Sequence, residues 1–158
     1  CIPFIPSALF SSLSNLMVAP NKYIFWSFCV GVMILIFLKS TNRDLNLREI
    51  FWITYLFVIS LVEEITFRLS IPLVATEFFG IGLFWFYVFL SNTLFAIIHY
   101  FTLRWKIRAC ILAFLGGMAF SRLFETTEDL ALVIILHWAI TFLNTPTPPK
   151  IENLAMKN

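Results

Sequence analysis

Residues 50–74, IFWITYLFVISLVEEITFRLSIPLV, form an apolar run about as long as a bilayer is thick, and they carry Glu63, Glu64 and Arg68 near its middle. Each charged side chain at the centre of a membrane helix costs roughly 2.5–3.5 kcal/mol on insertion scales. Helical geometry places Glu64 and Arg68, four positions apart, on one face, where they can neutralise each other, and leaves Glu63 without a local partner. Intramembrane ionisable residues usually mark a functional site, and a structural ion pair with one spare glutamate is the alternative.

The composition indicates an integral membrane protein in contact with the lipid bilayer. Of the 158 residues, 60% are hydrophobic and 13% are charged, and the mean hydropathy is +0.90, far outside the range of a soluble domain. A net charge of +2 gives no indication of a nucleic-acid surface. The cysteines have no C-x-x-C spacing, so neither a disulfide framework nor a zinc cluster is predicted for Cys1, Cys29 and Cys110.

The pattern predicts an all-α fold, a polytopic transmembrane helix bundle of about five spanning helices. Residues 1–20 are interrupted by prolines and are predicted to form an N-terminal interfacial or partial helix. Residues 21–144 are predicted to form the bundle. Residues 145–158, which begin T-P-T-P-P, are predicted to form a polar tail. Asp44 or Asn46 is expected to cap the second span. The spans are expected at 23–38, 50 to 75–77, 78–101, 107–124 and 130–143.

The basic residues predict the orientation of this bundle. With five spans, the loops after the first and third spans lie on the same side as the tail. That side holds eight basic residues against two on the other, and the positive-inside rule makes it cytoplasmic. The acidic turn at 125–129 then faces outward, and we expect a bacterial cytoplasmic membrane. The eight are Lys39, Arg43, Arg48, Arg104, Lys106, Arg108, Lys150 and Lys157, and the two are Lys22 and Arg122.

Both histidines of the chain fall inside expected spans, each within a polar stripe. Each stripe must turn away from lipid. If both meet the Glu63 face of the second span, one pocket holds two carboxylates, two imidazoles, an arginine and several amide or hydroxyl groups. The stripes are Asn92, Phe95 and His99 on the third span, and His137, Thr141 and Asn144 on the fifth.

Three motifs resemble those of one family. E-E-I-T-F-R at 63–68, F-A-I-I-H at 95–99 and H-W-A-I-T at 137–141 are similar, in order, to the motifs of the CAAX prenyl protease and bacteriocin-processing (CPBP, Abi) family of intramembrane proteases. The family patterns are Glu-Glu-x-x-x-Arg, Phe-x-x-x-His and His-x-x-x-Asn. The first two are complete, whereas Thr141 stands where the third has Asn, and Asn144 lies further along. The resemblance covers about residues 48–144, the expected protease-like core.

The resemblance implies a metal-free, glutamate-dependent endopeptidase that hydrolyses a peptide bond of a membrane-associated or lipidated peptide or protein. Glu63 would be the general base, His99 would help to position and activate the attacking water, and His137 would stabilise the oxyanion. Both imidazoles lie in the cytoplasmic half of their spans, so we expect the active site to face the cytoplasm. The expected supporting residues are Glu64 and Arg68, a pair that would orient Glu63, together with Asn92, Phe95, Thr141 and Asn144.

Three alternatives stay open. Glu63, His99 and His137 could be the three ligands of a catalytic zinc ion with an open fourth position. A non-catalytic immunity or partner-binding membrane protein could use the same fold, an alternative that the changed third motif favours. A proton-coupled transporter could also use Glu and His relays, but five short spans without an inverted repeat argue against it.

Overall fold

The computed structural model describes residues 4–145, 147 and 148, and this part of the chain is helical in every element. The expected all-α class is confirmed. Cys1 and nearly all of the expected tail at 145–158, with Lys150 and Lys157, lie outside the described residues. The elements are α1 Phe4–Val18, α2 Pro20–Ser40, α3 Leu47–Glu64, a π-helical segment η1 Ile65–Ser70, α4 Ile71–Phe79, a 3-10 turn η2 Ile81–Leu83, α5 Phe84–Thr102, α6 Ile107–Thr127 and α7 Leu130–Asn144.

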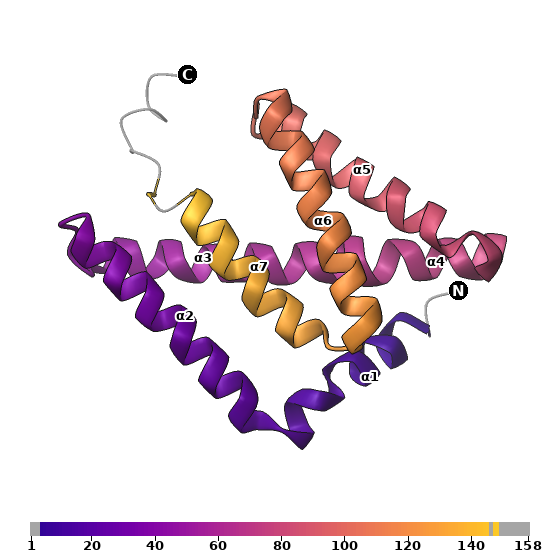
Figure 1. Cartoon of the computed structure of the whole chain (residues 1–158), viewed down its shortest axis with the longest axis horizontal. Coiled ribbons are helices and arrows are strands. Elements are labelled where there is room, and N and C mark those ends of the chain that lie inside the picture. Colours follow the sequence, from indigo (N-terminus) through magenta and orange to yellow (C-terminus); the bar gives the residue numbers. More distant parts are fainter. Residues whose placement is uncertain (1–3, 146, 149–158) are drawn as a thin grey trace.

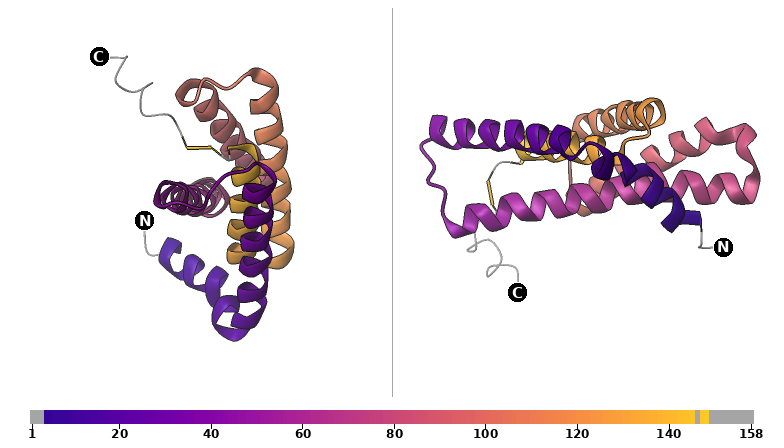
Figure 2. Two further views of the ribbon diagram at one scale, coloured as in Figure 1. Left: turned by 90° about the vertical axis from the view of Figure 1, so that its left-hand side faces the viewer. Right: turned by 90° about the horizontal axis from the view of Figure 1, so that it is seen from below.

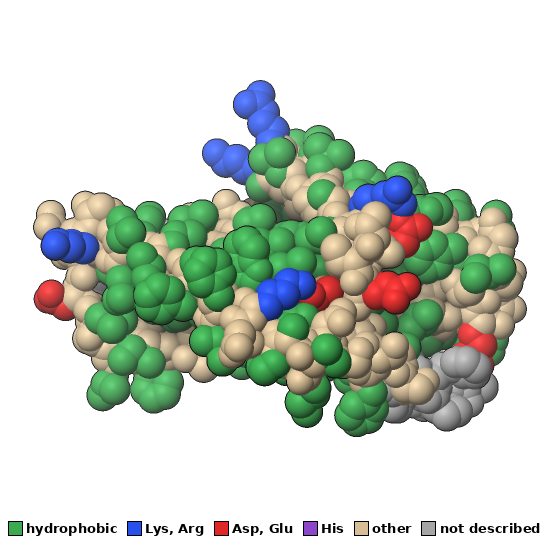
Figure 3. Space-filling model, turned by 60° about the horizontal axis from the view of Figure 1, so that its bottom comes forward, with side chains coloured by type: hydrophobic (Ala, Val, Ile, Leu, Met, Phe, Trp, Pro, Cys, Tyr) green, Lys and Arg blue, Asp and Glu red, His purple; other side chains and the backbone are tan. Residues whose placement is uncertain are grey.

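The helices are arranged around one long rod. α3, η1 and α4 follow one another without a break over Leu47–Phe79 and cross the whole molecule in Figure 1. α2, α7 and α6 lie together over one side of this rod, and α5 packs beside α4 and forms a hairpin with α6 (Figure 2). Apolar side chains are spread over the whole length of the face shown in Figure 3, as contact with lipid requires.

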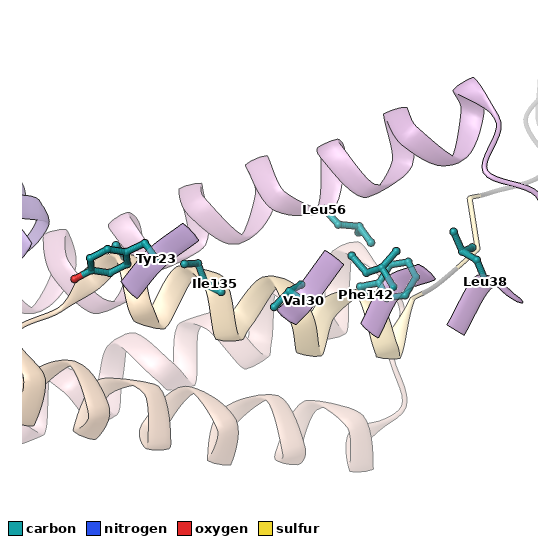
Figure 4. Close-up of a cluster of buried hydrophobic side chains, with 8 residues drawn as sticks. Tyr23, Val30, Leu38, Leu56, Ile135 and Phe142 are labelled. Carbon is teal, nitrogen blue, oxygen red and sulfur yellow. The ribbon is translucent and has the colours of Figure 1, made fainter. Parts of the chain in front are cut away.

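Four described helices are long and apolar enough to cross a membrane: Pro20–Ser40, Leu47–Phe79, Ile81–Thr102 and Ile107–Thr127. The fifth expected span is α7, which has 15 residues and is therefore about 22 Å long, shorter than a bilayer core. α7 is instead a core helix. Its buried side chains pack against α2 and α3 in the cluster shown in Figure 4, which contains Tyr23, Val30, Ile34, Leu38, Leu56, Ala131, Ile135 and Phe142.

α1 packs on the bundle. Its side chains Ala8, Leu9 and Leu13 contact a second buried cluster, to which η1 and α7 contribute Leu69 and Leu130. A helix is thus present within residues 1–20, and it packs against η1 and α7.

The π-helical segment interrupts the α-helix that the sequence predicts through residues 50–74. The N–H of Ile71 donates to the carbonyl of Thr66, five positions back, which is the π pattern. Pro72 follows, and its ring would clash with the carbonyl four residues earlier in a regular α-helix. The wider turn avoids that clash. Pro72 also has no N–H for the carbonyl of Phe67, which accepts a 2.6 Å hydrogen bond from the hydroxyl of Ser91 on α5 instead.

The largest difference between the predicted and observed helix ends is at the start of the third span. The third span, expected from residue 78, begins as α5 at Phe84. Gly80 has a φ of 89°, a left-handed conformation that ends α4, and the short η2 turn separates it from α5. Asn46 caps α3 as predicted, its side chain accepting from the N–H of Glu49 at 3.0 Å.

Polar contacts hold both ends of α7. At its start, Asp129 accepts hydrogen bonds from the N–H of Leu132 at 3.0 Å, Lys22 Nζ at 2.9 Å and the Tyr23 hydroxyl at 2.7 Å. Burial raises the pKa of Asp129, but the hydrogen bonds from Leu132, Tyr23 and Lys22 and the charge of Lys22 together hold that pKa below its ordinary value. At its other end, Trp52 Nε1 donates to the carbonyl of Thr145 at 2.9 Å. α7 therefore runs antiparallel to α3.

Candidate active site

Glu63 faces both histidines, which come from two other helices. Its Oε1 lies 3.5 Å from His99 Nε2 on α5, and its Oε2 lies 3.6 Å from His137 Nε2 on α7. Both histidines are buried, whereas the Glu63 side chain is 19% exposed. The three side chains meet as the polar stripes predict, and Glu63 is the most exposed of them.

Glu64 is fully buried and contacts two different groups. Its Oε1 lies 2.6 Å from His137 Nδ1, and its Oε2 lies 3.2 Å from Arg68 Nε. The ion pair predicted from the spacing of Glu64 and Arg68 is therefore present. The sequence also predicts that this pair orients Glu63, and in the structure Glu64 reaches Glu63 through the ring of His137.

His99 is held by its own helix and by two aromatic rings. Its Nδ1 lies 2.8 Å from the carbonyl oxygen of Phe95, one turn earlier on α5. The Phe95 ring lies 4.3 Å from the imidazole between centroids, and the Trp105 ring 4.8 Å from it. Phe95 also lies 4.7 Å from the guanidinium carbon of Arg68 in a cation–π contact. Phe95 thus links the arginine to the histidine, and the Nε2 of His99 is left to face Glu63.

The charges of this cluster do not balance while both histidines are neutral. Two carboxylates, Glu63 and Glu64, lie with one guanidinium, Arg68, in a largely buried site. A net charge out of water is costly. One additional proton, on Glu63 or on an imidazole, makes the cluster neutral. The arrangement can therefore hold one exchangeable proton, as acid–base chemistry requires.

Asn92 lies in a polar layer beside Arg68. It is fully buried, and its Nδ2 donates to the carbonyl of Val88 at 2.9 Å and to Ser121 Oγ at 3.0 Å. A Cβ at Gly117 would lie 2.1 Å from Asn92 Oδ1 and 3.0 Å from Arg68 Nη2. The absence of a side chain at Gly117 lets α6 approach both groups, so Asn92 joins α5 to α6 beside the arginine.

The structure separates Thr141 from Asn144. Thr141 is half-buried, and its hydroxyl accepts a hydrogen bond from Ser60 Oγ at 3.5 Å. Ser60 lies on α3, one turn before Glu64. Asn144 is exposed at the end of α7. Because α7 runs antiparallel to α3, its last turn lies beside the start of α3 and away from Glu63. The spacing that predicts a shared face for Asn144 therefore does not bring it to the site.

Three aromatic and hydroxyl residues were not predicted from the sequence: Phe120, Trp105 and Ser60. The Phe120 ring lies 5.4 Å from the His137 ring and 5.9 Å from the Arg68 guanidinium carbon. Its position three residues after Gly117 places it on the same face of α6, which is the available signal. In a chain with nineteen Phe, that signal does not single out one ring.

Within the described residues, no group of three or more His, Cys, Asp and Glu side chains is arranged to hold a metal ion. Glu63, His99 and His137, named above as alternative zinc ligands, are not among such groups in the described residues.

The comparisons with known proteins agree with the three motifs. The family model described as "Type II CAAX prenyl endopeptidase Rce1-like" matches residues 46–143, which is more than half of the chain and includes α3 to α7 except the last residue of α7. Neither the curated proteins nor the solved structures gave a match. The resemblance to the CAAX protease family is thereby confirmed. The chain is an integral membrane protein of the Rce1-like family of type II CAAX prenyl endopeptidases.

Proposed function

We propose that the protein is an intramembrane endopeptidase of the CAAX-protease type with Glu63 as its general base. The observation that carries the proposal is the position of the Glu63 carboxylate between the Nε2 atoms of two buried histidines, at 3.5 and 3.6 Å. A water molecule within hydrogen-bonding distance of Glu63 and His99, about 2.8 Å from each, fits this geometry. Family membership supports the reaction class.

The proposed reaction uses one water molecule and forms no covalent bond between the enzyme and the substrate. Glu63 takes a proton from water as the water oxygen bonds to the scissile carbonyl carbon, and His99 orients that water. The charge that develops on the carbonyl oxygen is stabilised by His137, and such a donor commonly contributes about 3–4 kcal/mol. The carbon–nitrogen bond then breaks, and the proton passes to the leaving amine.

The substrate would be a peptide or protein held at the membrane, including lipidated ones. The site is enclosed by apolar helices, which restricts access to a chain that is already in or at the bilayer. His99 lies in the last turn of α5, next to the basic loop that carries Arg104, Lys106 and Arg108. The positive-inside rule supports a position in the cytoplasmic half of the membrane, and we propose that this is a bacterial cytoplasmic membrane.

The test is cleavage by matched variants reconstituted in lipid vesicles. Wild type, Glu63→Ala and the control Glu125→Ala, which alters an exposed glutamate on α6, are incubated with lipidated and unlipidated membrane peptides. We expect cleavage by wild type and the control and none by Glu63→Ala, with a strong chelator having no effect. Cleavage by Glu63→Ala would reject the proposal, and loss with chelator would restore the zinc alternative.

A non-catalytic partner-binding role is the second candidate. It is favoured by Thr141, which stands where the family motif has Asn. In this structure the Thr141 hydroxyl accepts a hydrogen bond from Ser60. An immunity protein of this kind would protect a host cell equally well with or without the Glu63 carboxylate. Equal protection by wild type and Glu63→Ala, together with no cleavage by either, would support this role over proteolysis.

A further inference from the structure

Two contacts decide which nitrogen of each imidazole carries the proton. Glu64 is a carboxylate because it forms an ion pair with Arg68, and the 2.6 Å approach of its Oε1 to His137 Nδ1 is favourable when that nitrogen carries a proton. The carbonyl of Phe95 can only accept, so His99 Nδ1 is also protonated. Both rings therefore present Nε2 to Glu63.

We propose that Glu64 is the positioning residue of His137, and this inference rests on the proposed function. Glu64 keeps a proton on Nδ1 whether the ring is neutral or doubly protonated, so only Nε2, which faces Glu63, gains and loses a proton. A neutral His137 accepts at Nε2, and a doubly protonated His137 donates from it to the developing oxyanion. A carboxylate that holds a catalytic imidazole in one tautomer and balances its charge is a general device of hydrolases.

The two histidines are held by different groups, which divides their tasks. The carbonyl of Phe95 behind His99 is uncharged, whereas Glu64 behind His137 carries a negative charge that balances a doubly protonated ring. His137 is thus the ring fitted to donate to an oxyanion. His99 is fitted to accept a hydrogen bond from the attacking water.

Glu64 is itself held on its other side. Its Oε2 lies 3.2 Å from Arg68 Nε, and both side chains are almost fully buried. The Arg68 guanidinium carbon lies 4.7 Å from the Phe95 ring and 5.9 Å from the Phe120 ring. Side chains packed in this way have little freedom to turn, and the order Arg68, Glu64, His137, Glu63 runs through successive contacts.

An isosteric substitution tests the tautomer. The side chain of Glu64→Gln has one acceptor oxygen, which faces the charged Arg68, so its NH₂ group faces His137 Nδ1. Because the NH₂ group is a donor, it favours the tautomer of His137 that has no proton on Nδ1. The chain has two histidines, so the ring nitrogens of ¹⁵N-histidine-labelled protein give two sets of signals, assigned with His99→Gln. At a pH where the rings are neutral, we expect the Nδ1–H form of His137 in wild type and the Nε2–H form in Glu64→Gln.

The signals of His99 serve as the internal control, because the contact of His99 with Phe95 is unchanged. Glu64→Asp, which keeps a carboxylate, should retain the Nδ1–H form of His137. Cleavage depends on the charge of Glu64: without it the doubly protonated His137 is no longer balanced, so we expect kcat of Glu64→Gln to fall about 10²- to 10⁴-fold with KM unchanged, and Glu64→Asp to recover part of it. The inference is overturned by an Nε2–H form of His137 in wild type, which can be read even if no Glu64 variant folds, or by an unchanged spectrum in Glu64→Gln.

The inference and the proposed function fail in different measurements. If Glu63→Gln cleaves normally while Glu64→Gln changes the tautomer, the proposed function is wrong and the positioning contact stands. If Glu63→Gln is inactive while Glu64→Gln leaves the His137 signals unchanged, proteolysis stands and the role of Glu64 is wrong.

Discussion

The hydroxyl of Ser91 on α5 donates a 2.6 Å hydrogen bond to the backbone carbonyl of Phe67 in η1. That carbonyl has no backbone donor, because the residue five positions on is Pro72. We expect Ser91→Ala to lower the free energy of unfolding by about 1–3 kcal/mol, since it leaves a buried carbonyl unsatisfied. Unfolding in mixed detergent measures the change. Ser40→Ala, which removes an exposed hydroxyl bonded to its own helix, is the control, and an equal effect of both would contradict the expectation.

Two adjacent glycines give a matched pair. The Cβ of Gly117→Ala would lie 2.1 Å from Oδ1 of the fully buried Asn92, whereas a Cβ at Gly116 meets nothing within 4 Å. We expect Gly117→Ala to destabilise the protein by about 1–3 kcal/mol, as overpacking does. Gly116→Ala should be neutral or stabilising by up to about 1 kcal/mol. Thermal unfolding compares them, and a similar loss in both variants would show that α6 does not approach Asn92 closely.

Asp129 predicts a dependence of stability on pH. Its pKa lies below the ordinary value of 3.8 in the folded protein, so its contribution to stability is fully present above about pH 4 and is lost as the pH falls through the folded value. Asp129→Asn can still cap α7 but cannot pair with the charge of Lys22. We expect the variant to be less stable at neutral pH and to lose this acid-side slope. A slope identical to that of wild type would exclude Asp129 as its source.

Thr141 tests whether the changed third motif limits the reaction. An Asn side chain reaches further than a Thr hydroxyl and donates through its amide, so we expect Thr141→Asn to raise kcat with KM unchanged. The comparison is made with Ser60→Ala, which removes the present partner of Thr141 without adding a donor. A Thr141→Asn variant that is no faster than wild type would show that the third motif is not limiting.

Local and lipid-driven features were predictable from the sequence. The Glu64–Arg68 pair follows from helical spacing alone, and the inward position of His99 and His137 follows because lipid offers polar groups no partner. Both depend on one helix at a time. For that reason the polar stripes were visible without knowledge of the packing.

The remaining features depend on contacts between helices. The π turn needs Ser91 of α5 as well as Pro72, and the contact between Glu64 and His137 needs the register of α7 against α3. That same register carries Asn144 away from the site. Packing of α1 on the bundle likewise depends on Leu69 and Leu130, which no pattern within residues 1–20 reveals.

The cleavage rate of Glu63→Gln, alone and combined with His137→Gln, tests the central claim most directly. Residues that act on one water as a unit are strongly non-additive. We expect Glu63→Gln to lower kcat/KM about 10²- to 10⁴-fold, and the double variant to be no slower than the slower single variant. A Glu63→Gln enzyme within a few-fold of wild type, or losses that multiply in the double variant, would contradict a shared catalytic centre at Glu63.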